Sequence, residues 1–301
     1  MSPEYNIQKV WAIQLRLLDK LLSVCQTNGL QIWADSGTLL GAIRHKGFIP
    51  WDDDIDMAMM REDYDRLVEI SAKEFTSPFF FQTAYSEDAP YPRGHAQLRM
   101  DGTTAILPFD VDQDFHQGIF IDIFPLDSVP DSISERDQLI QTRNQKIEMM
   151  NNYVYHHFSL LHPSYNKRIF AIKKEIDQVG FKSYFAAFEN IFRAFPLSNS
   201  KTVCCLSFCT DLQSLQFNKD WYSETLLVPF ENLLIPVPVG YDSILTKQYG
   251  DYMTPVKAPS MHGQYLVLDP DKPYTEYLPV LRKEKRKRIR AERFSKYFRK
   301  K

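Results

Sequence analysis

The chain has 301 residues, of which 44% are hydrophobic and 25% are charged, and its net charge is −2. This composition is typical of a globular protein and excludes a mainly disordered chain. Glycine is scarce, at 11 residues, and no GxGxxG or GxxxxGKS/T string occurs, which argues against a glycine-rich nucleotide loop.

The amino-terminal segment, "MSPEYNIQKVWAIQL", lacks the basic flank and apolar core of a signal peptide, and no run of 18 apolar residues occurs. We therefore expect a cytoplasmic protein whose cysteines remain thiols. Cys205 and Cys209 have the spacing of half a zinc site, but the pattern offers no second pair of ligands. We expect buried thiols at these positions, at Cys25 and at Cys204, and no zinc.

Hydrophobic spacing predicts the elements of the first quarter of the chain. Apolar residues recur at helical intervals over residues 7–27 and stop at an Asn-Gly pair, which predicts a helix. The elements expected next are a short strand at 30–34, a short helix at 36–47, a strand at 54–60 and a helix at 61–75.

Several short strands are expected between residues 79 and 124. The last of them, "GIFIDIF", is apolar except for Asp122, which is typical of a central buried strand. Residues 131–195 predict two or three helices with a break at 161–166. We therefore expect an α/β fold in four parts, namely a catalytic core at 1–130, a helical segment at 131–200, a C-terminal region packed on the core at 201–275, and a basic tail at 276–301.

The stretch "GFIPWDDDIDMAMM" crowds Asp52, Asp53, Asp54 and Asp56 against the start of a predicted strand. Burying unpaired carboxylates is costly, so a positive partner is expected. In a strand, Asp54 and Asp56 would point to one face, which suits Mg²⁺, and Asp122 would supply a third acid from a later strand. In the alternative interpretation, the first three acids cap a turn and Asp56 faces water.

A small-residue turn at Ser36 and Gly37, followed by an Asp-hydrophobic-Asp strand and a later Asp-bearing strand, resembles the active site of nucleotidyltransferase-type enzymes. That resemblance implies a nucleotidyltransferase-like core built on a mixed sheet, in which the turn approaches phosphate. Three blocks also look like the signature of the LicD family, which includes bacterial phosphocholine transferases and fukutin-related sugar-phosphate transferases. The blocks are "WADSGTLLGAIRHKGFIPWDDDIDMAMMREDYDRL" (33–67), "GIFIDIFPLDSVP" (118–130) and "YDSILTKQYGDYMTP" (241–255).

The family resemblance implies transfer of a phospho-substituent from a CDP-linked donor to a sugar hydroxyl, with release of CMP. We expect a Mg²⁺-dependent phosphotransferase that moves phosphocholine from CDP-choline to a cell-surface glycan, either lipopolysaccharide or teichoic acid. Within the enzyme class, the alternative is transfer of ribitol- or glycerol-phosphate from the CDP-polyol. Outside it, the alternative is an inactive nucleotide-binding scaffold, against which the three retained acids argue.

In this mechanism Asp54, Asp56 and Asp122 are the expected catalytic residues and hold one or two Mg²⁺ ions, with Mn²⁺ as an alternative. Asp122 either completes the metal site or takes the proton of the acceptor hydroxyl. Asp52 and Asp53 are expected to support the metal ligands from behind.

Basic and aromatic residues supply the candidate contacts to the substrates. A guanidinium suits bidentate phosphate contact, so Arg44 is the first choice, whereas Lys46 fits a solvated helix end equally well. Arg99 and His262 match positions where the family carries basic residues. The full predicted set of substrate-binding residues is Ser36, Gly37, Thr38, Arg44, His45, Lys46, Arg99, Tyr252 and His262.

The charge is unevenly distributed. Residues 282–301 hold 12 Lys and Arg against 2 Glu, whereas the rest of the chain holds 24 against 36. Basic segments that carry apolar residues, here Ile289, Phe294 and Tyr297, bind anionic membrane surfaces, so we expect the tail to hold the protein at the inner membrane face. The alternatives are a solvated tail or incidental nucleic-acid binding, and the acidic body argues against nucleic acid as a partner.

Overall fold

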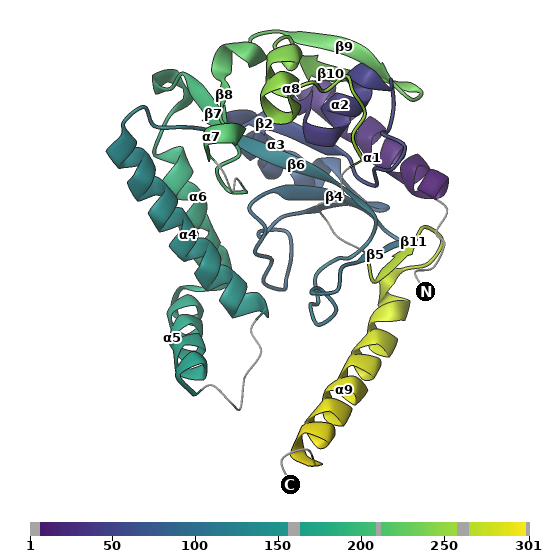
Figure 1. The fold of residues 1–301 in the computed structure, drawn as a ribbon, viewed down its shortest axis with the longest axis vertical. Helices are drawn as coiled ribbons and strands as arrows, with labels where there is room; N and C mark the ends of the chain where they lie inside the picture. The colour runs from purple at the N-terminus through teal and green to yellow at the C-terminus, as the bar shows by residue number, and fades with distance from the viewer. Residues whose placement is uncertain (1–6, 156–162, 209–211, 258–264, 299–301) are drawn as a thin grey trace.

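The computed structural model describes residues 7–155, 163–208, 212–257 and 265–298, which form a mixed α/β fold (Figure 1). A curled mixed sheet lies at the centre with helices around it, and one long helix projects from the body. The predicted α/β fold class is therefore confirmed.

The first elements follow in the order that the hydrophobic pattern predicts. They are α1 (Ile7–Asn28), β1 (Trp33–Ala34), α2 (Ser36–Arg44), β2 (Asp56–Met60) and α3 (Arg61–Glu74).

Several boundaries differ from the prediction: β1 begins at Trp33 instead of 30, α1 and α3 each end one residue away, and two further differences flank the Asp-rich stretch. Helix α2 ends at Arg44 instead of 47, because Lys46 has φ 58°, a left-handed conformation of the kind that ends helices. Strand β2 begins at Asp56 instead of 54, so Asp54 lies in the loop ahead of the strand. The prediction that Asp54 and Asp56 share one face of a strand is therefore wrong.

The central sheet contains β1, β2, β3 (Phe79–Gln82), β4 (Ala96–Met100) and β6 (Phe120–Ser128) in the order β1-β2-β6-β4-β3. Strands β2 and β6 run parallel, and their first pairing is Asp56 with Asp122. The other pairs in this order are antiparallel. The sheet extends from β6 through β7 (Thr202–Cys204) to β8 (Phe217–Asn218).

The two faces of the central sheet differ in polarity. Side chains of β2, β4 and β6 on one face join the largest apolar cluster, together with residues of α1 and α3. The members from these elements include Met57, Met59, Leu98, Ile121, Ile123, Leu17, Leu21 and Leu67. Because side chains alternate along a strand, Asp56, Gln97 and Asp122 lie on the opposite face.

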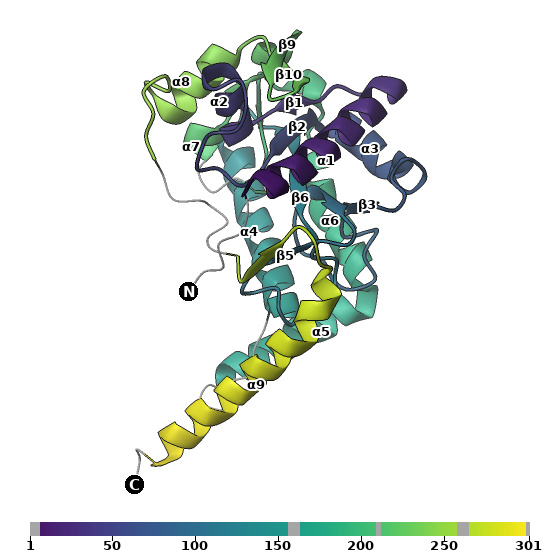
Figure 2. The ribbon, with the colours of Figure 1, turned by 90° about the vertical axis from the view of Figure 1, so that its right-hand side faces the viewer.

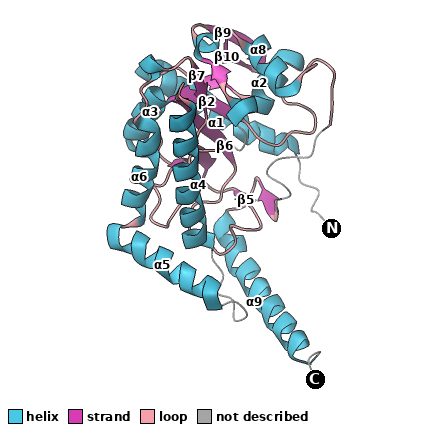
Figure 3. Cartoon of the chain, turned by 60° about the vertical axis from the view of Figure 1, so that its left-hand side comes forward, coloured by secondary structure: helices cyan, strands magenta, loops and turns pink. Residues whose placement is uncertain are grey.

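Three helices form a separate layer beside the sheet (Figure 3), namely α4 (Ile133–Tyr155), α5 (Pro163–Val179) and α6 (Phe181–Arg193). They share an apolar cluster that includes Met150, Phe188 and Phe192. A buried ion pair joins this layer to the sheet, because Arg61 donates to Asp127 at 2.6 and 3.0 Å and to Glu189 at 3.3 Å.

The C-terminal region packs against the first elements of the chain. Its further elements are η1 (Leu197–Asn199), α7 (Leu212–Leu215), η2 (Lys219–Tyr222), β9 (Thr225–Phe230), β10 (Leu233–Pro238), α8 (Tyr241–Tyr249) and β11 (Val267–Asp269). Phe230, Ile235 and Ile244 belong to the same apolar cluster as α1. Strand β11 pairs with β5 (Thr104–Ile106). Cys209 lies outside the described residues.

Helix α9 (Tyr274–Phe298) projects from the body, as Figures 1 and 2 show. Its base is fixed by Leu278, which is buried beside Ile106, and by Arg282, which donates to the carbonyls of Val111 and Gln113 at 2.7 and 2.6 Å. Within the described part of the chain, no helix combines the length and apolar content needed to cross a membrane.

Candidate active site

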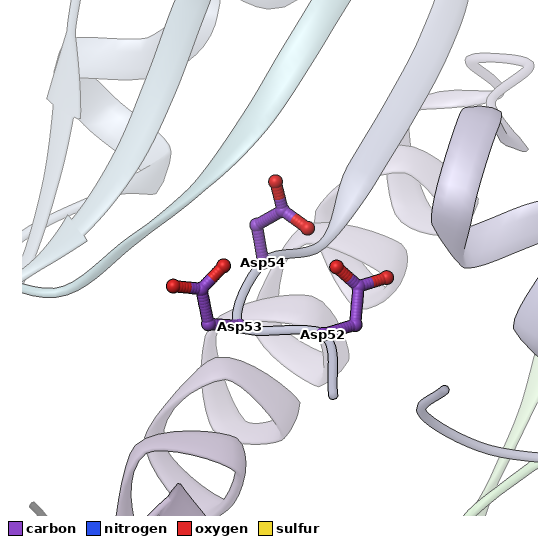
Figure 4. A group of neighbouring side chains, drawn as sticks. All are labelled: Asp52, Asp53 and Asp54. Atoms are coloured by element: carbon purple, nitrogen blue, oxygen red, sulfur yellow. The ribbon is translucent and has the colours of Figure 1, made fainter. Parts of the chain in front are cut away.

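The loop ahead of β2 gathers three carboxylates on one turn (Figure 4). One ligand oxygen each from Asp52, Asp53 and Asp54 lies within 4.8 Å of the others. Helix α1 holds this loop from below, because Trp11 Nε1 donates to the carbonyl of Asp52 at 3.0 Å and Gln14 Nε2 donates to that of Asp53 at 2.8 Å. The acids expected to stand behind the metal ligands therefore lie directly beside Asp54.

The start of α2 closes tightly over this loop. A Cβ atom on Gly37 would lie 2.7 Å from Asp52 Oδ2, so any larger residue here would displace the Asp52 carboxylate. Ser36 has φ 47°, and its hydroxyl donates to Asp35 Oδ2 at 3.2 Å. Thr38 is 3% exposed and its hydroxyl oxygen accepts from the Asp56 amide at 2.8 Å. Thr38 thus fixes the start of β2, and its predicted contact with substrate is not supported by this position.

The carboxylates of the loop repel one another. Burial, together with the charges of Asp54 and Asp53, raises the pKa of Asp52 to about 8. Burial also raises the pKa of Asp35, while its hydrogen bonds with Ser36 oppose that shift. Burial thus makes the ionised forms of Asp52 and Asp35 unfavourable without a positive partner, which is the condition that favours a bound cation.

Asp122 joins the site from the neighbouring strand. It faces Asp56 in the parallel register of β2 and β6, where strands lie about 4.8 Å apart. Asp122 is 1% exposed, and its Oδ1 accepts from Gln97 Nε2 at 2.6 Å and lies 3.2 Å from His95 Nε2. This register places Asp122 beside Asp56, and its meeting with Asp54 around a cation stays a prediction.

Two tyrosines from distant parts of the chain lie near these acids. Burial raises the pKa of Tyr249, at the end of α8, and the carboxylates of Asp35, Asp56, Asp52 and Asp54 raise it further. Burial likewise raises the pKa of Tyr265, with further contributions from Asp53, Asp54 and Asp122. Tyr249 remains 44% exposed, so its ring borders both the acids and solvent.

Tyr252, the aromatic residue predicted to face the substrate, is otherwise engaged. Its hydroxyl donates to Asp242 Oδ1 at 2.7 Å, and its carbonyl accepts from Arg44 Nη1 at 2.6 Å. The electrostatic contacts with the acids belong to Tyr249, three residues earlier. Contact of Tyr252 with substrate stays a prediction, and Tyr249 is a second candidate from the same turn.

The basic residues at the end of α2 are partly accessible. Arg44 and His45 are half-buried, and Arg44 Nε donates to His45 Nδ1 at 3.3 Å. Burial lowers the pKa of Arg44, and burial and Arg44 lower that of His45. Lys46 is exposed and its carbonyl accepts from the Glu231 amide at 2.8 Å. Binding of phosphate by these residues stays a prediction.

Arg99 differs from its prediction. It is 2% exposed, and its guanidinium donates to Gln82 Oε1, to the carbonyl of Gly118 at 2.6 Å and to Gln97 Oε1. A direct contact with phosphate or acceptor is therefore not supported, and Arg99 lies beneath the site. His262 lies outside the described residues.

Sequence reasoning missed four residues that the structure brings near the acids, namely Asp35, His95, Gln97 and Tyr265. His95, Gln97 and Arg99 alternate with apolar residues in "GHAQLRM", a pattern that predicts one polar face of a strand. Tyr265 had no such signal, because only the tertiary fold brings it to the acids.

The fold and the site define an α/β protein whose two adjacent parallel strands and preceding loop collect carboxylates beside a helix start. Residues 29–161 match the family described as LicD/FKTN/FKRP, nucleotidyltransferase domain. The chain therefore carries a LicD-family domain, and the resemblance recognised in its sequence blocks is confirmed.

Individual relatives extend this similarity. The lipopolysaccharide cholinephosphotransferase LicD of Haemophilus influenzae is 28% identical over 240 residues, which cover 79% of this chain and 88% of that protein. An uncharacterized protein of Rickettsia prowazekii is 29% identical over 50% of this chain and 53% of its own length. The ribitol 5-phosphate transferase FKRP of Homo sapiens is 35% identical over 24% of this chain and 16% of its own length. Two of these three relatives are named as phosphate-group transferases.

Proposed function

We propose that this protein transfers phosphocholine from CDP-choline to a sugar hydroxyl of a cell-surface glycan, lipopolysaccharide or teichoic acid, and releases CMP. The observation that carries the proposal is the pairing of Asp56 with Asp122 on two adjacent parallel strands, directly after a loop that gathers Asp52, Asp53 and Asp54. Further support comes from the cholinephosphotransferase relative, which this chain covers over 88% of its length. The name of the matched domain supports a nucleotidyltransferase-like core.

The donor set fits Mg²⁺, with Mn²⁺ as an alternative. All candidate ligands are carboxylates, which Mg²⁺ prefers, and burial and the neighbouring charges of Asp54 and Asp53 disfavour the ionised form of Asp52 unless a cation is bound. Asp54, Asp56 and Asp122 would hold one or two ions. When bound, Mg²⁺ supplies charge neutralisation for the donor diphosphate.

The protein's own residues would orient the two substrates. Arg44, at the end of α2, is the first candidate to bind diphosphate oxygens, with His45 and Lys46 beside it. The Ser36–Gly37 turn allows close approach of the backbone, as its contact with Asp52 illustrates. Tyr249 borders the acids from α8 and can cover the bound donor.

Aromatic rings near Asp122 favour choline over a polyol. The His95 ring lies 4.7 Å from the Phe124 ring and 5.7 Å from the Phe208 ring, and Phe208 is 50% exposed. Aromatic faces attract quaternary ammonium groups, whereas a polyol would require more hydrogen-bonding side chains. The runner-up remains transfer of ribitol- or glycerol-phosphate, which the similarity to FKRP supports.

A thermal-shift panel tests this proposal. CDP-choline, CDP-ribitol and CDP-glycerol are each added with and without Mg²⁺, and we expect metal-dependent stabilisation by CDP-choline. Asp54→Asn should lose the response, and Asp137→Asn, the same change on the exposed surface of α4, should keep it. Stabilisation by a CDP-polyol alone would replace choline with that donor. Stabilisation without any release of CMP in the presence of acceptor glycan would favour the scaffold alternative.

We also propose that the protein is cytoplasmic and that α9 holds it at an anionic membrane surface. Beyond Lys285, which pairs with Asp112 at 2.5 Å, the helix carries the exposed basic residues Arg286, Lys287 and Arg290. Each basic residue near such a surface contributes about 1 kcal/mol. Co-sedimentation with vesicles that contain phosphatidylglycerol, but not with phosphatidylcholine vesicles, is expected. Equal binding to both, or to neither, would refute the proposal.

A further inference from the structure

The carboxylate of Asp122 is held by side chains of strand β4. Gln97 lies directly opposite Asp122 in the antiparallel register, and its Nε2 donates to Asp122 Oδ1 at 2.6 Å. His95, two residues earlier on the same face, places Nε2 3.2 Å from that same oxygen. Two nitrogen donors thus converge on one oxygen of a carboxylate that is 1% exposed.

The orientation of the Gln97 amide is itself determined by its neighbours. Its Oε1 accepts from the Tyr91 hydroxyl at 2.6 Å and from Arg99 Nη2. A guanidinium can only donate, so the amide oxygen must face Arg99 and the amide nitrogen must face Asp122. Arg99 therefore excludes the flipped amide, in which an oxygen would face the carboxylate.

Arg99 in turn is fixed from several sides. Besides Gln97, it donates to Gln82 and to the carbonyl of Gly118, and its guanidinium lies 4.6 Å from the centre of the Phe120 ring. Burial lowers its pKa, and the charges of Tyr91 and Asp122 oppose that shift. Burying a guanidinium costs free energy, and the hydrogen bonds that Arg99 makes here must offset that cost.

We propose that Gln97 and His95 are positioning residues that orient Asp122 as a metal ligand, and that Arg99 acts through Gln97. The proposal rests on the proposed function, which makes Asp122 a ligand. Hydrogen-bonding partners behind a metal ligand typically contribute 10- to 100-fold to metal affinity, because they hold the ligand in its binding orientation. The face of β4 that supports Asp122 thus belongs to the functional part of the protein.

The experiment measures the dissociation constant of Mn²⁺ by electron paramagnetic resonance of the free ion, with the full chain and without substrates. For Gln97→Met, which keeps the side-chain length and removes the donor, the constant should rise at least about 10-fold. Gln117→Met is the matched control, because Gln117 is another buried glutamine whose amide donates to the carbonyls of Asp110 and Gln113. Its Mn²⁺ constant should equal that of the wild type.

Milder variants keep the test decisive if Gln97→Met does not fold. Tyr91→Phe removes one hydroxyl that orients Gln97, and a smaller rise in the Mn²⁺ constant is expected. His95→Leu should weaken Mn²⁺ binding, and His95→Gln, which retains a nitrogen donor, should restore it. A purely structural role would change stability in these variants without this pattern of loss and rescue.

The outcomes separate this inference from the proposed function. Unchanged Mn²⁺ binding in Gln97→Met and His95→Leu, with binding lost in Asp54→Asn, would overturn the positioning role and leave the proposed function intact. A wild-type protein that binds no Mn²⁺ and transfers phosphocholine without a divalent ion would overturn the metal site itself. Loss of affinity in Gln97→Met and His95→Leu, with rescue by His95→Gln, is the result expected.

Discussion

The two faces of the central sheet are built from the same strands, but one carries apolar side chains and the other carries polar side chains. On one face Met57, Ile121 and Ile123 pack against α1 and α3 in the largest apolar cluster. On the other face, the polar side chains of Asp56, Gln97 and Asp122 are buried or half-buried. The comparison teaches that burial alone does not make a face apolar, because buried polar side chains such as Gln97 and Asp122 are stabilised by hydrogen bonds.

Removing a carboxylate from the polar face should give the largest effect. Asp54→Asn keeps the size of the side chain and removes a charge from the acid loop, so we expect phosphotransfer to fall by about 10³-fold or more while the fold persists. The measurement is release of CMP with saturating Mg²⁺, and circular dichroism reports the fold. Substantial transfer by this variant would remove Asp54 from the catalytic set.

Removing apolar volume from the other face should act on stability alone. Leu21 on α1 is fully buried, and Leu21→Ala should lower the free energy of unfolding by about 2–5 kcal/mol. The matched control is Leu227→Ala on β9, where the side chain is 64% exposed and a change within about 0.5 kcal/mol is expected. Urea unfolding measures both. Loss of Mn²⁺ binding by a folded Leu21→Ala variant would contradict the prediction that the apolar face affects stability alone.

The acid loop should make stability depend on pH in a defined direction. The pKa of Asp52 is raised to about 8 from 3.8, so the folded chain binds this proton more tightly than the unfolded chain does. The stability that the proton contributes is present below pH 4 and is lost as the pH rises towards 8. Compared with Asp52→Asn, the metal-free wild type should therefore lose stability over this range, and Mg²⁺ should reduce the loss. Parallel stability curves for the two proteins would contradict the pKa shift.

The smallest effect should come from Tyr252. Its hydroxyl binds the exposed Asp242, so Tyr252→Phe should change stability by no more than about 0.5 kcal/mol and leave transfer nearly unchanged. Tyr249→Phe, which alters the tyrosine beside the acids, should reduce transfer more. Steady-state rates with the CDP-linked donor rank the two variants. A reversed order would restore Tyr252 as the residue that faces substrate.

Local signals explain why the order of elements was predictable. Periodicity and a left-handed glycine, Gly29 with φ 66°, define α1, and the apolar run around Asp122 defines a buried strand. The Asp-rich stretch was also recognisable in the sequence as a candidate site, because burying several unpaired carboxylates is costly. Asp54 was wrongly placed in the strand because the alternation of acidic and apolar residues begins at Asp54, whereas strand pairing begins at Asp56. Alternation alone does not define where strand pairing begins.

The supporting residues were harder to predict because their partners lie far away in the sequence. Arg99 carries the charge expected of a phosphate ligand, but its role depends on Gln82, Gln97 and Gly118, which only strand pairing brings together. Tyr249 and Tyr252 lie in one sequence block, and only the position of α8 reveals that Tyr249 borders the acids. His95 gave no sign of its contact with Asp122 beyond its place in an alternating segment.

Helix α1 carries a consequence for anyone who shortens this protein. The segment that matches the family begins at residue 29, yet Trp11 and Gln14 hold the acid loop from a helix that ends at Asn28. A fragment trimmed to the matched boundaries would keep the carboxylates of the acid loop and lose the two hydrogen bonds that hold this loop. A fragment that keeps this loop supported therefore has to include α1, which precedes the matched segment.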